Sequence, residues 1–231
     1  HESLGIHASI DNHDAVKNSE VIVLGVLPQQ MQLLAKDIAL IVKKNKPLII
    51  SVAIGISVEM LSRWLGGNAA IVRSMPNTPA LVSAAATGLY ASTLVTESQK
   101  AFAESLHRAV GIVTWVDKES LIDVIAALSG SGPACLFYMI EAMQTAAIKL
   151  GLPEKEAIEL ASQTALGASR LLVESGDDTA TLFKKSTAPK GTTEQAIKVF
   201  DERQFPKMIE EGMQAAILRA QVLTASLEKE E

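Results

Sequence analysis

The sequence predicts an α/β protein in two parts, a domain built on a parallel sheet followed by an all-helical domain. In the first half, short apolar, often β-branched runs alternate with segments of helical period. After about residue 119 no strand candidate remains. Aromatic residues make up only 4% of the chain, so the core must consist of small and aliphatic side chains, which favours closely packed helices. We therefore expect a Rossmann-like domain over residues 1–119 and a helical domain over residues 120–231.

The predicted strands are short runs that suit burial on both faces of a sheet. Val21-Ile22-Val23-Leu24-Gly25-Val26 is continuously apolar and β-branched, and residues 48–52 repeat the pattern. The remaining strands are expected at about 70–75, 86–91 and 111–116.

Helices are predicted between these strands and throughout the second half. Pro28 suits the first turn of a helix, and Ser57 is a candidate N-cap for a second helix that ends at Gly66-Gly67. The other helices are expected at about 97–109, 133–150, 154–174 and 205–228. Alanine-rich faces on the helices expected at 133–150 and 205–228 allow close helix approach. These faces can pack either inside the domain or against a second copy of the chain.

Composition and charge argue against several kinds of partner. The net charge is −5 and no basic stripe occurs, which argues against nucleic-acid binding. The single cysteine, Cys135, allows no intrachain disulfide and is expected to be a buried small residue. No continuous apolar run reaches the roughly 18 residues of a membrane helix. We therefore expect no membrane partner and a cytoplasmic location.

A Rossmann domain normally carries a glycine-rich G-x-G-x-x-G loop after its first strand, and this sequence lacks it. The nearest match, Gly130-Ser131-Gly132, follows no strand, and Cys135 stands in place of the third glycine. We interpret this segment as a tight loop that opens a helix. The first strand, the glycine loop and the first helix are expected upstream of His1.

Three loops carry residues suited to binding a ligand. Residues 25–28 and 75–79 follow predicted strands, and the carboxyl ends of strands are where open α/β sheets bind ligands. Residues 186–195 open a helix with glycine and hydroxyl residues, and such a start exposes backbone N–H groups to a carboxylate. Taken singly, each loop is better explained as a capped helix or a structural turn than as a binding site.

Five segments occur in an order and spacing that match one family over nearly the whole chain. They are Gly25-Val26-Leu27-Pro28, Ser51-Val52-Ala53-Ile54-Gly55, Met75-Pro76-Asn77-Thr78-Pro79, Ala127-Leu128-Ser129-Gly130-Ser131-Gly132-Pro133-Ala134 and Ala188-Pro189-Lys190-Gly191-Thr192-Thr193. By these motifs the sequence resembles the pyrroline-5-carboxylate reductases. The resemblance implies a Rossmann domain and a helical dimerisation domain, with dimers that often assemble into larger rings. It also implies reduction of 1-pyrroline-5-carboxylate to L-proline with NADPH or NADH, in proline biosynthesis.

The same resemblance assigns roles to individual residues. The residues expected beside the cofactor are Asn12, Val26, Leu27, Pro28, Ala53 and Asn77. Those expected beside the substrate are Asn77, Thr78, Ser131, Gly191, Thr192 and Thr193. The resemblance implies that backbone N–H groups of residues 191–193 hold the substrate carboxylate. It also implies that Thr193 is the catalytic residue, with its hydroxyl near the ring nitrogen.

Such a reaction requires few catalytic side chains. A protonated cyclic imine is already electrophilic, so the enzyme must mainly hold ring C5 near nicotinamide C4. A hydroxyl such as that of Thr193 can donate a hydrogen bond as charge leaves the nitrogen. We expect no metal site, and we expect the histidines at 1, 7, 13 and 107 to neighbour none of these loops.

Three residues depart from the family pattern. Leu27 replaces a lysine, Lys190 replaces the first glycine of a G-G-T-T turn, and Lys185 stands where a neutral polar group is expected. If position 190 needs a positive φ, a lysine there costs roughly 1 kcal/mol or more. Two alternatives remain open, namely a reductase of the same fold that acts on another small cyclic imine or ketoacid, and a non-catalytic dimeric scaffold.

Overall fold

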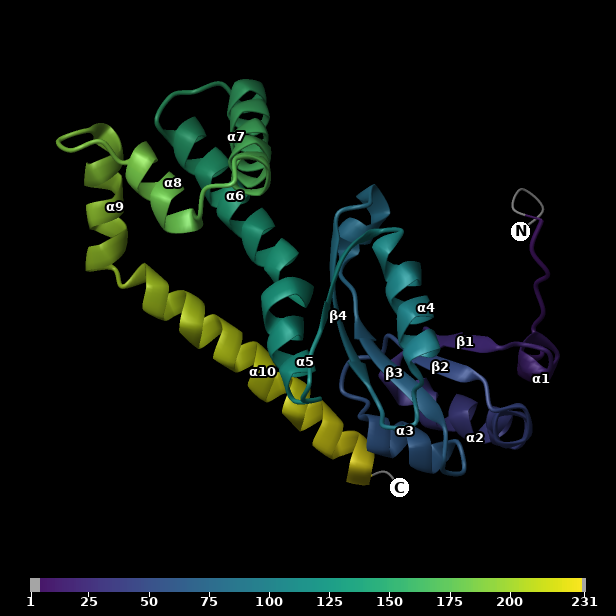
Figure 1. Cartoon of the computed structure of the whole chain (residues 1–231). Helices are drawn as coiled ribbons and strands as arrows, with labels where there is room; N and C mark the ends of the chain where they lie inside the picture. Colours follow the sequence, from purple (N-terminus) through teal and green to yellow (C-terminus); the bar gives the residue numbers. More distant parts are fainter. Residues whose placement is uncertain (1–4, 230–231) are drawn as a thin grey trace. The chain divides into compact units, whose positions relative to one another are not determined.

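The computed structural model describes residues 5–229 and divides into two compact units (Figure 1). The first unit comprises His1–Pro133 together with Met213–Glu231, and the second comprises Ala134–Gly212. This division differs from the boundary predicted between residues 119 and 120. Helix α5 (Leu121–Ile125) packs on the sheet, and Leu227, near the end of the chain, belongs to the same buried cluster as residues of the sheet.

The first unit contains a five-stranded sheet in the order β1-β2-β3-β4-β5. Its strands are β1 (Val21–Leu24), β2 (Leu48–Ser51), β3 (Ala70–Met75), β4 (Ala85–Ala91) and β5 (Gly111–Trp115). Every neighbouring pair is parallel except β3 and β4, which are antiparallel, so the prediction of a parallel sheet was wrong at this pair. Only the short 3-10 helix η2 (Thr78–Val82) joins β3 to β4, whereas a parallel crossover needs about a dozen residues or more.

Helices of the first unit cover both faces of this sheet. They are α1 (Asn12–Val16), α2 (Pro28–Asn45), α3 (Val58–Trp64), α4 (Glu97–Arg108), α5, the π-helical segment η3 (Ala126–Gly130) and the end of α10 (Phe205–Lys229). Pro28 opens α2 and the Ser57 hydroxyl accepts from the backbone N–H of Met60, as predicted.

The core of the first unit follows the period-2 alternation of β2. Ile49 belongs to a buried cluster with residues of α2 and α3, whereas Leu48 and Ile50 belong to a second cluster with Ala103 of α4. These three side chains are at most 1% exposed. Each contributes about 1.5–3 kcal/mol relative to an exposed side chain, so the two helical layers fix the sheet from both sides.

The second unit is helical throughout. It contains α6 (Gly132–Lys149), which begins in the first unit, α7 (Glu154–Glu174), α8 (Thr179–Ser186), α9 (Thr192–Glu202) and the first part of α10. No residue of α6 is buried, and large apolar side chains such as Phe137 (67%) and Tyr138 (76%) are exposed. Cys135 on the same helix is also exposed, contrary to expectation. Much of the apolar surface of α6 is therefore left uncovered by the other described residues.

One continuous helix in the described part of the chain, Leu121–Lys149, is long and apolar enough to cross a membrane by length and composition alone. The expected absence of a membrane partner therefore stays a prediction.

Candidate functional site

The loop after β1 opens beside a cavity at the carboxyl end of that strand. The cavity, of about 400 Å³, is lined by Asn12, Val26, Gln30, Leu33, Leu34 and Asp37. Leu27 is 66% exposed and Pro28 begins α2. The structure thus brings Asn12 and Val26, two of the predicted cofactor residues, to the same cavity. It leaves Ala53 out of that lining, since Ala53 is only 6% exposed and belongs to the core cluster.

Asn12 owes its position to polar contacts between α1 and α2. Its Nδ2 donates to Oδ2 of Asp37 at 3.0 Å, and Nε2 of the neighbouring His13 lies 2.8 Å from the carbonyl oxygen of Asp37. The hydrogen bond to this carbonyl is the main reason that the pKa of His13 lies above its ordinary value. The negative charge of the Asp37 carboxylate is the second reason. Asp37 therefore holds α1 against α2 and keeps Asn12 at the edge of the cavity.

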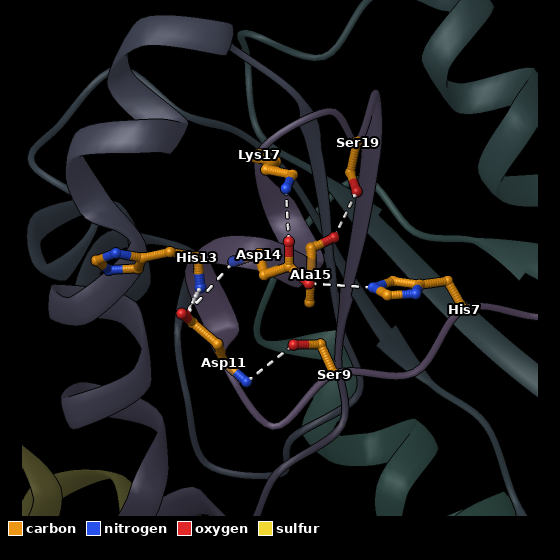
Figure 2. A network of polar contacts seen from close by, with 8 residues as sticks. All are labelled: His7, Ser9, Asp11, His13, Asp14, Ala15, Lys17 and Ser19. Carbon is orange, nitrogen blue, oxygen red and sulfur yellow. Dashed lines mark hydrogen bonds and ion pairs between the residues drawn. The ribbon is translucent and has the colours of Figure 1, made fainter.

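Within α1 a second set of contacts stabilises the helix itself (Figure 2). The Asp11 carboxylate caps the helix by accepting from the backbone N–H groups of His13 and Asp14. Asp14 in turn pairs with Lys17 and His7. The hydrogen bond from Lys17 is the main reason that the pKa of the Asp14 carboxyl lies well below its usual range.

The predicted loops 75–79 and 127–134 contact each other. The Nδ2 of Asn77 donates to the carbonyl oxygen of Ser129 at 2.9 Å, and its Oδ1 accepts from the backbone N–H of Ala86 at 3.0 Å. A Cβ at Gly130 would lie 2.8 Å from Cε of Met75, so this segment approaches the end of β3 closely. The loop that carries Asn77 and Thr78 thus lies against the segment that precedes Ser131.

The segment around Ser131 is a π-helical turn and not the tight loop that we expected. The backbone N–H of Ser131 donates to the carbonyl of Ala126, five residues earlier, at 2.9 Å. The turn continues from α5 into α6. Single π turns inside longer helices occur frequently at functional sites.

The predicted carboxylate-binding segment lies in the second unit, at the start of α9. Gly191 is the N-cap, with no side-chain cap, and Thr192 and Thr193 form the first turn. Lys190 has φ +60°, so this position does require the left-handed conformation that glycine adopts freely. Its backbone N–H donates to Oε2 of Glu194 at 2.8 Å. The N–H groups of a helix start carry partial positive charge and suit an anion.

Two contacts beside the site were missed from the sequence. Ser74, directly before the 75–79 loop, hydrogen-bonds Nε2 of His107 at 2.7 Å, although no histidine was expected near this loop. Because Nδ1 of His107 faces the carbonyl of Ala103 at 2.8 Å, Nδ1 donates there, and in this tautomer Nε2 accepts from the Ser74 hydroxyl. No local pattern in the sequence indicates this contact, because Ser74 on β3 and His107 on α4 lie 33 positions apart.

The second missed contact is a partly buried ionic cluster. Arg73, 6% exposed on β3, donates to Glu119 at 3.2 Å and to Asp123 at 2.8 Å. Glu119 also accepts from the backbone N–H of Val58 at 2.7 Å. The cluster therefore joins β3, α5 and the start of α3. Among the described residues no group of three or more metal-ligating side chains occurs.

Comparisons with known proteins agree on one family. The profile described as pyrroline-5-carboxylate reductase dimerisation matches residues 119–223. The chain is 43% identical over 216 residues to the pyrroline-5-carboxylate reductase of Pseudomonas aeruginosa, covering 94% of this chain and 79% of that protein. It is 32% identical to the Escherichia coli pyrroline-5-carboxylate reductase, covering 98% of this chain and 83% of that protein.

Solved structures give the same result. The structure of a pyrroline-5-carboxylate reductase from Coxiella burnetii is similar with a TM-score of 0.91 and 43% identity, covering 96% of this chain and 83% of that one. The Plasmodium falciparum pyrroline carboxylate reductase with NADP bound has the same fold, with a TM-score of 0.85 and 24% identity, over 94% of this chain and 81% of that one.

Proposed function

The chain belongs to the pyrroline-5-carboxylate reductase family, and we infer from this that it reduces 1-pyrroline-5-carboxylate to L-proline in proline biosynthesis. The observation that carries this inference is the 43% identity to the Pseudomonas aeruginosa reductase over 94% of the chain. The hydride donor is NADPH or NADH, and the Plasmodium falciparum relative binds NADP.

The nicotinamide dinucleotide is held at the carboxyl ends of β1 and β2. These strands are parallel neighbours, so the segments that follow them meet at one edge of the sheet. The cavity lined by Asn12 and Val26 has no cationic side chain in its lining, which fits an uncharged part of the dinucleotide. Leu27, Pro28 and Ala53 border the same edge. When bound, the reduced nicotinamide supplies the hydride.

The substrate carboxylate is held by the first turn of α9. Backbone N–H groups of Gly191, Thr192 and Thr193 supply donors there, and the helix dipole favours the negative charge. The Thr193 hydroxyl donates a hydrogen bond to the ring nitrogen, which gains electron density as the hydride arrives at C5. The resemblance also assigns Thr78 and Ser131 to the substrate.

The helical part mediates self-association, as the matching dimerisation profile indicates. In functional terms, residues 1–119 bind the dinucleotide and residues 120–231 bind substrate and a second copy. The exposed apolar side chains of α6 face that copy in a homodimer, which can assemble into a larger ring. We place this activity in the cytoplasm, without a nucleic-acid or membrane partner.

One observation favours a different substrate of the same class. Lys190 in the turn before Thr192 adds a cation where the family has glycine, and this change suits another small cyclic imine or ketoacid with more negative charge. A panel of such substrates separates the two possibilities by their kcat/KM values.

The first experiment is oxidation of NADPH and NADH with 1-pyrroline-5-carboxylate, followed by absorbance, on this chain and on any longer form of the protein. Turnover that yields proline supports the reductase. If neither form of the protein turns over any substrate of the panel, although it is folded and dimeric, the reductase is contradicted. The non-catalytic scaffold is then the remaining interpretation.

A further inference from the structure

The side chain of Asn77 is used twice in contacts with the backbone. Its Oδ1 accepts from Ala86 at the start of β4, and its Nδ2 donates to the carbonyl of Ser129 in the π turn. Both heavy polar atoms of the amide therefore have a protein partner. Each contact uses one of the two N–H groups of Nδ2 or one of the two lone pairs of Oδ1, and together they fix the orientation of the amide.

The Ser129 carbonyl needs this donor because of Pro133. In a regular α-helix the carbonyl of residue 129 accepts from the backbone N–H of residue 133. Pro133 has no N–H, so the helix itself leaves the Ser129 carbonyl without that partner. Asn77 supplies the missing hydrogen bond at 2.9 Å, across 52 positions of sequence.

The same contact places two segments that we assign to the substrate. Thr78 directly follows Asn77, and Ser131 lies two residues after Ser129. Gly130, between Ser129 and Ser131, approaches Met75 so closely that a Cβ at position 130 would force the end of the Met75 side chain to move. The π turn therefore lies directly against the loop after β3.

We propose that Asn77 is a positioning residue, which sets the relative places of Thr78 and Ser131 by giving the Ser129 carbonyl the hydrogen bond that Pro133 cannot give. This role rests on the proposed function and replaces our assignment of Asn77 to cofactor and substrate binding.

The test compares two variants of Asn77. Asn77→Asp keeps an acceptor for Ala86 and removes the donor to Ser129, whereas Asn77→Ala removes both. We expect kcat to fall about tenfold in Asn77→Asp, while the KM for the cofactor changes less than about twofold. Pro133→Ala in the Asn77→Asp background restores a backbone N–H four residues after Ser129 and should recover most of the lost kcat. A ligand-binding role for Asn77 predicts no such rescue.

The matched control is Asn45→Asp. Asn45 also donates its Nδ2 to a backbone carbonyl, that of Lys17 at 2.7 Å, but at the end of α2. We expect this variant to keep the kinetic constants of the parent chain. A tenfold rise in cofactor KM in Asn77→Asp, unrelieved by Pro133→Ala, would overturn the positioning role.

Amide hydrogen exchange at Ala86 gives a readout that does not depend on turnover. We expect faster exchange in Asn77→Ala and unchanged protection in Asn77→Asp. Equal exchange in the parent chain and Asn77→Ala would contradict the proposed contact. If the parent chain itself shows no turnover, the proposed function fails, and the exchange data together with rescue of thermal stability by Pro133→Ala still decide the role of Asn77.

Discussion

The Nη2 atom of Arg73 lies 2.8 Å from Oδ1 of Asp123, across 50 positions of sequence. Both side chains are largely removed from solvent, with exposures of 7% and 17%. Arg73 immediately precedes the Ser74-Met75 end of β3, and Asp123 lies on α5, one turn before the π segment. This ion pair therefore fixes the helix that carries Ser131 to the strand that leads to Asn77.

Removing one partner of this pair is expected to destabilise the protein strongly. Asp123→Ala leaves the buried Arg73 charge with only Glu119, and breaking a buried pair costs about 3–5 kcal/mol. Partial exposure of Asp123 places the expected loss near the lower end of that range. Urea unfolding measures the difference. The control is Arg108→Met, which removes a more exposed pair with Glu104 and should cost no more than about 1 kcal/mol. Equal losses in both variants would contradict a special role for Arg73.

The buried Ser74–His107 contact should appear as a coupling energy. Ser74 and His107 are 1% and 7% exposed, so Ser74→Ala leaves Nε2 of His107 without its donor, at a cost of about 1–3 kcal/mol. His107→Leu leaves the Ser74 hydroxyl unpaired at a similar cost. We expect the double variant to lose clearly less than the sum of the two single variants. Simple additivity in denaturant unfolding would show that the two side chains do not interact.

The elements that the sequence predicts well are those whose signal is local. The β2 run from Leu48 to Ser51 and the helix opened by Pro28 depend on neighbouring residues, and both begin where expected. The direction of β4 was wrong because the short connection through Thr78–Val82 was given no weight. The spacing of Ser129 and Pro133 already indicates a carbonyl without its helical donor, but no pattern points to Asn77 as the group that satisfies it.

The prediction of the site is also limited, because contacts between distant residues and the exposure of side chains are not encoded locally. The roles proposed for Val26 and Asn12 came from the family resemblance, and the structure brings both residues to one cavity. The burial of Ala53 and the exposure of Cys135 depend on which residues pack against them. Such contacts between distant residues cannot be predicted from a single sequence.

Stability near neutral pH should depend on His13 and Asp37. The pKa of His13 is raised from its ordinary value of 6.5, mainly by the Asp37 carbonyl and then by its carboxylate. A raised pKa means that the stabilisation is fully present below pH 6.5 and is lost as the pH rises through the higher folded value. The difference in melting temperature between the parent chain and Asp37→Asn should therefore shrink as the pH rises. A difference that grows with pH would contradict this sign. The NMR titration of His13 provides a direct check.

Lys190 is expected to lower the free energy of unfolding and also to lower the KM for the substrate. Its φ of +60° is strained for a lysine, so Lys190→Gly relieves roughly 1 kcal/mol of strain, partly offset by the greater freedom of glycine in the unfolded chain. The same change removes a cation next to the carboxylate-binding turn, so KM for the substrate should rise a few-fold. Because exposed charges are screened by salt, this rise should be smaller at high ionic strength. Lys190→Asn, which tolerates the conformation and lacks the charge, should show the same KM. An unchanged KM in both variants would show that the cation does not contribute.

Thr193→Val separates the two roles assigned to this residue. Valine has nearly the shape of threonine and keeps the backbone N–H, so the carboxylate contacts at the start of α9 should persist and KM should change little. The lost hydroxyl removes the donor to the ring nitrogen, and loss of one such donor typically lowers kcat about 100-fold or more. Thr192→Val is the matched control, because it makes the same change one residue earlier and should leave kcat within about twofold. If instead KM rises and kcat persists in Thr193→Val, the hydroxyl binds the substrate without assisting hydride transfer. The hydrogen bond to the developing lone pair on the nitrogen then comes from water or another side chain.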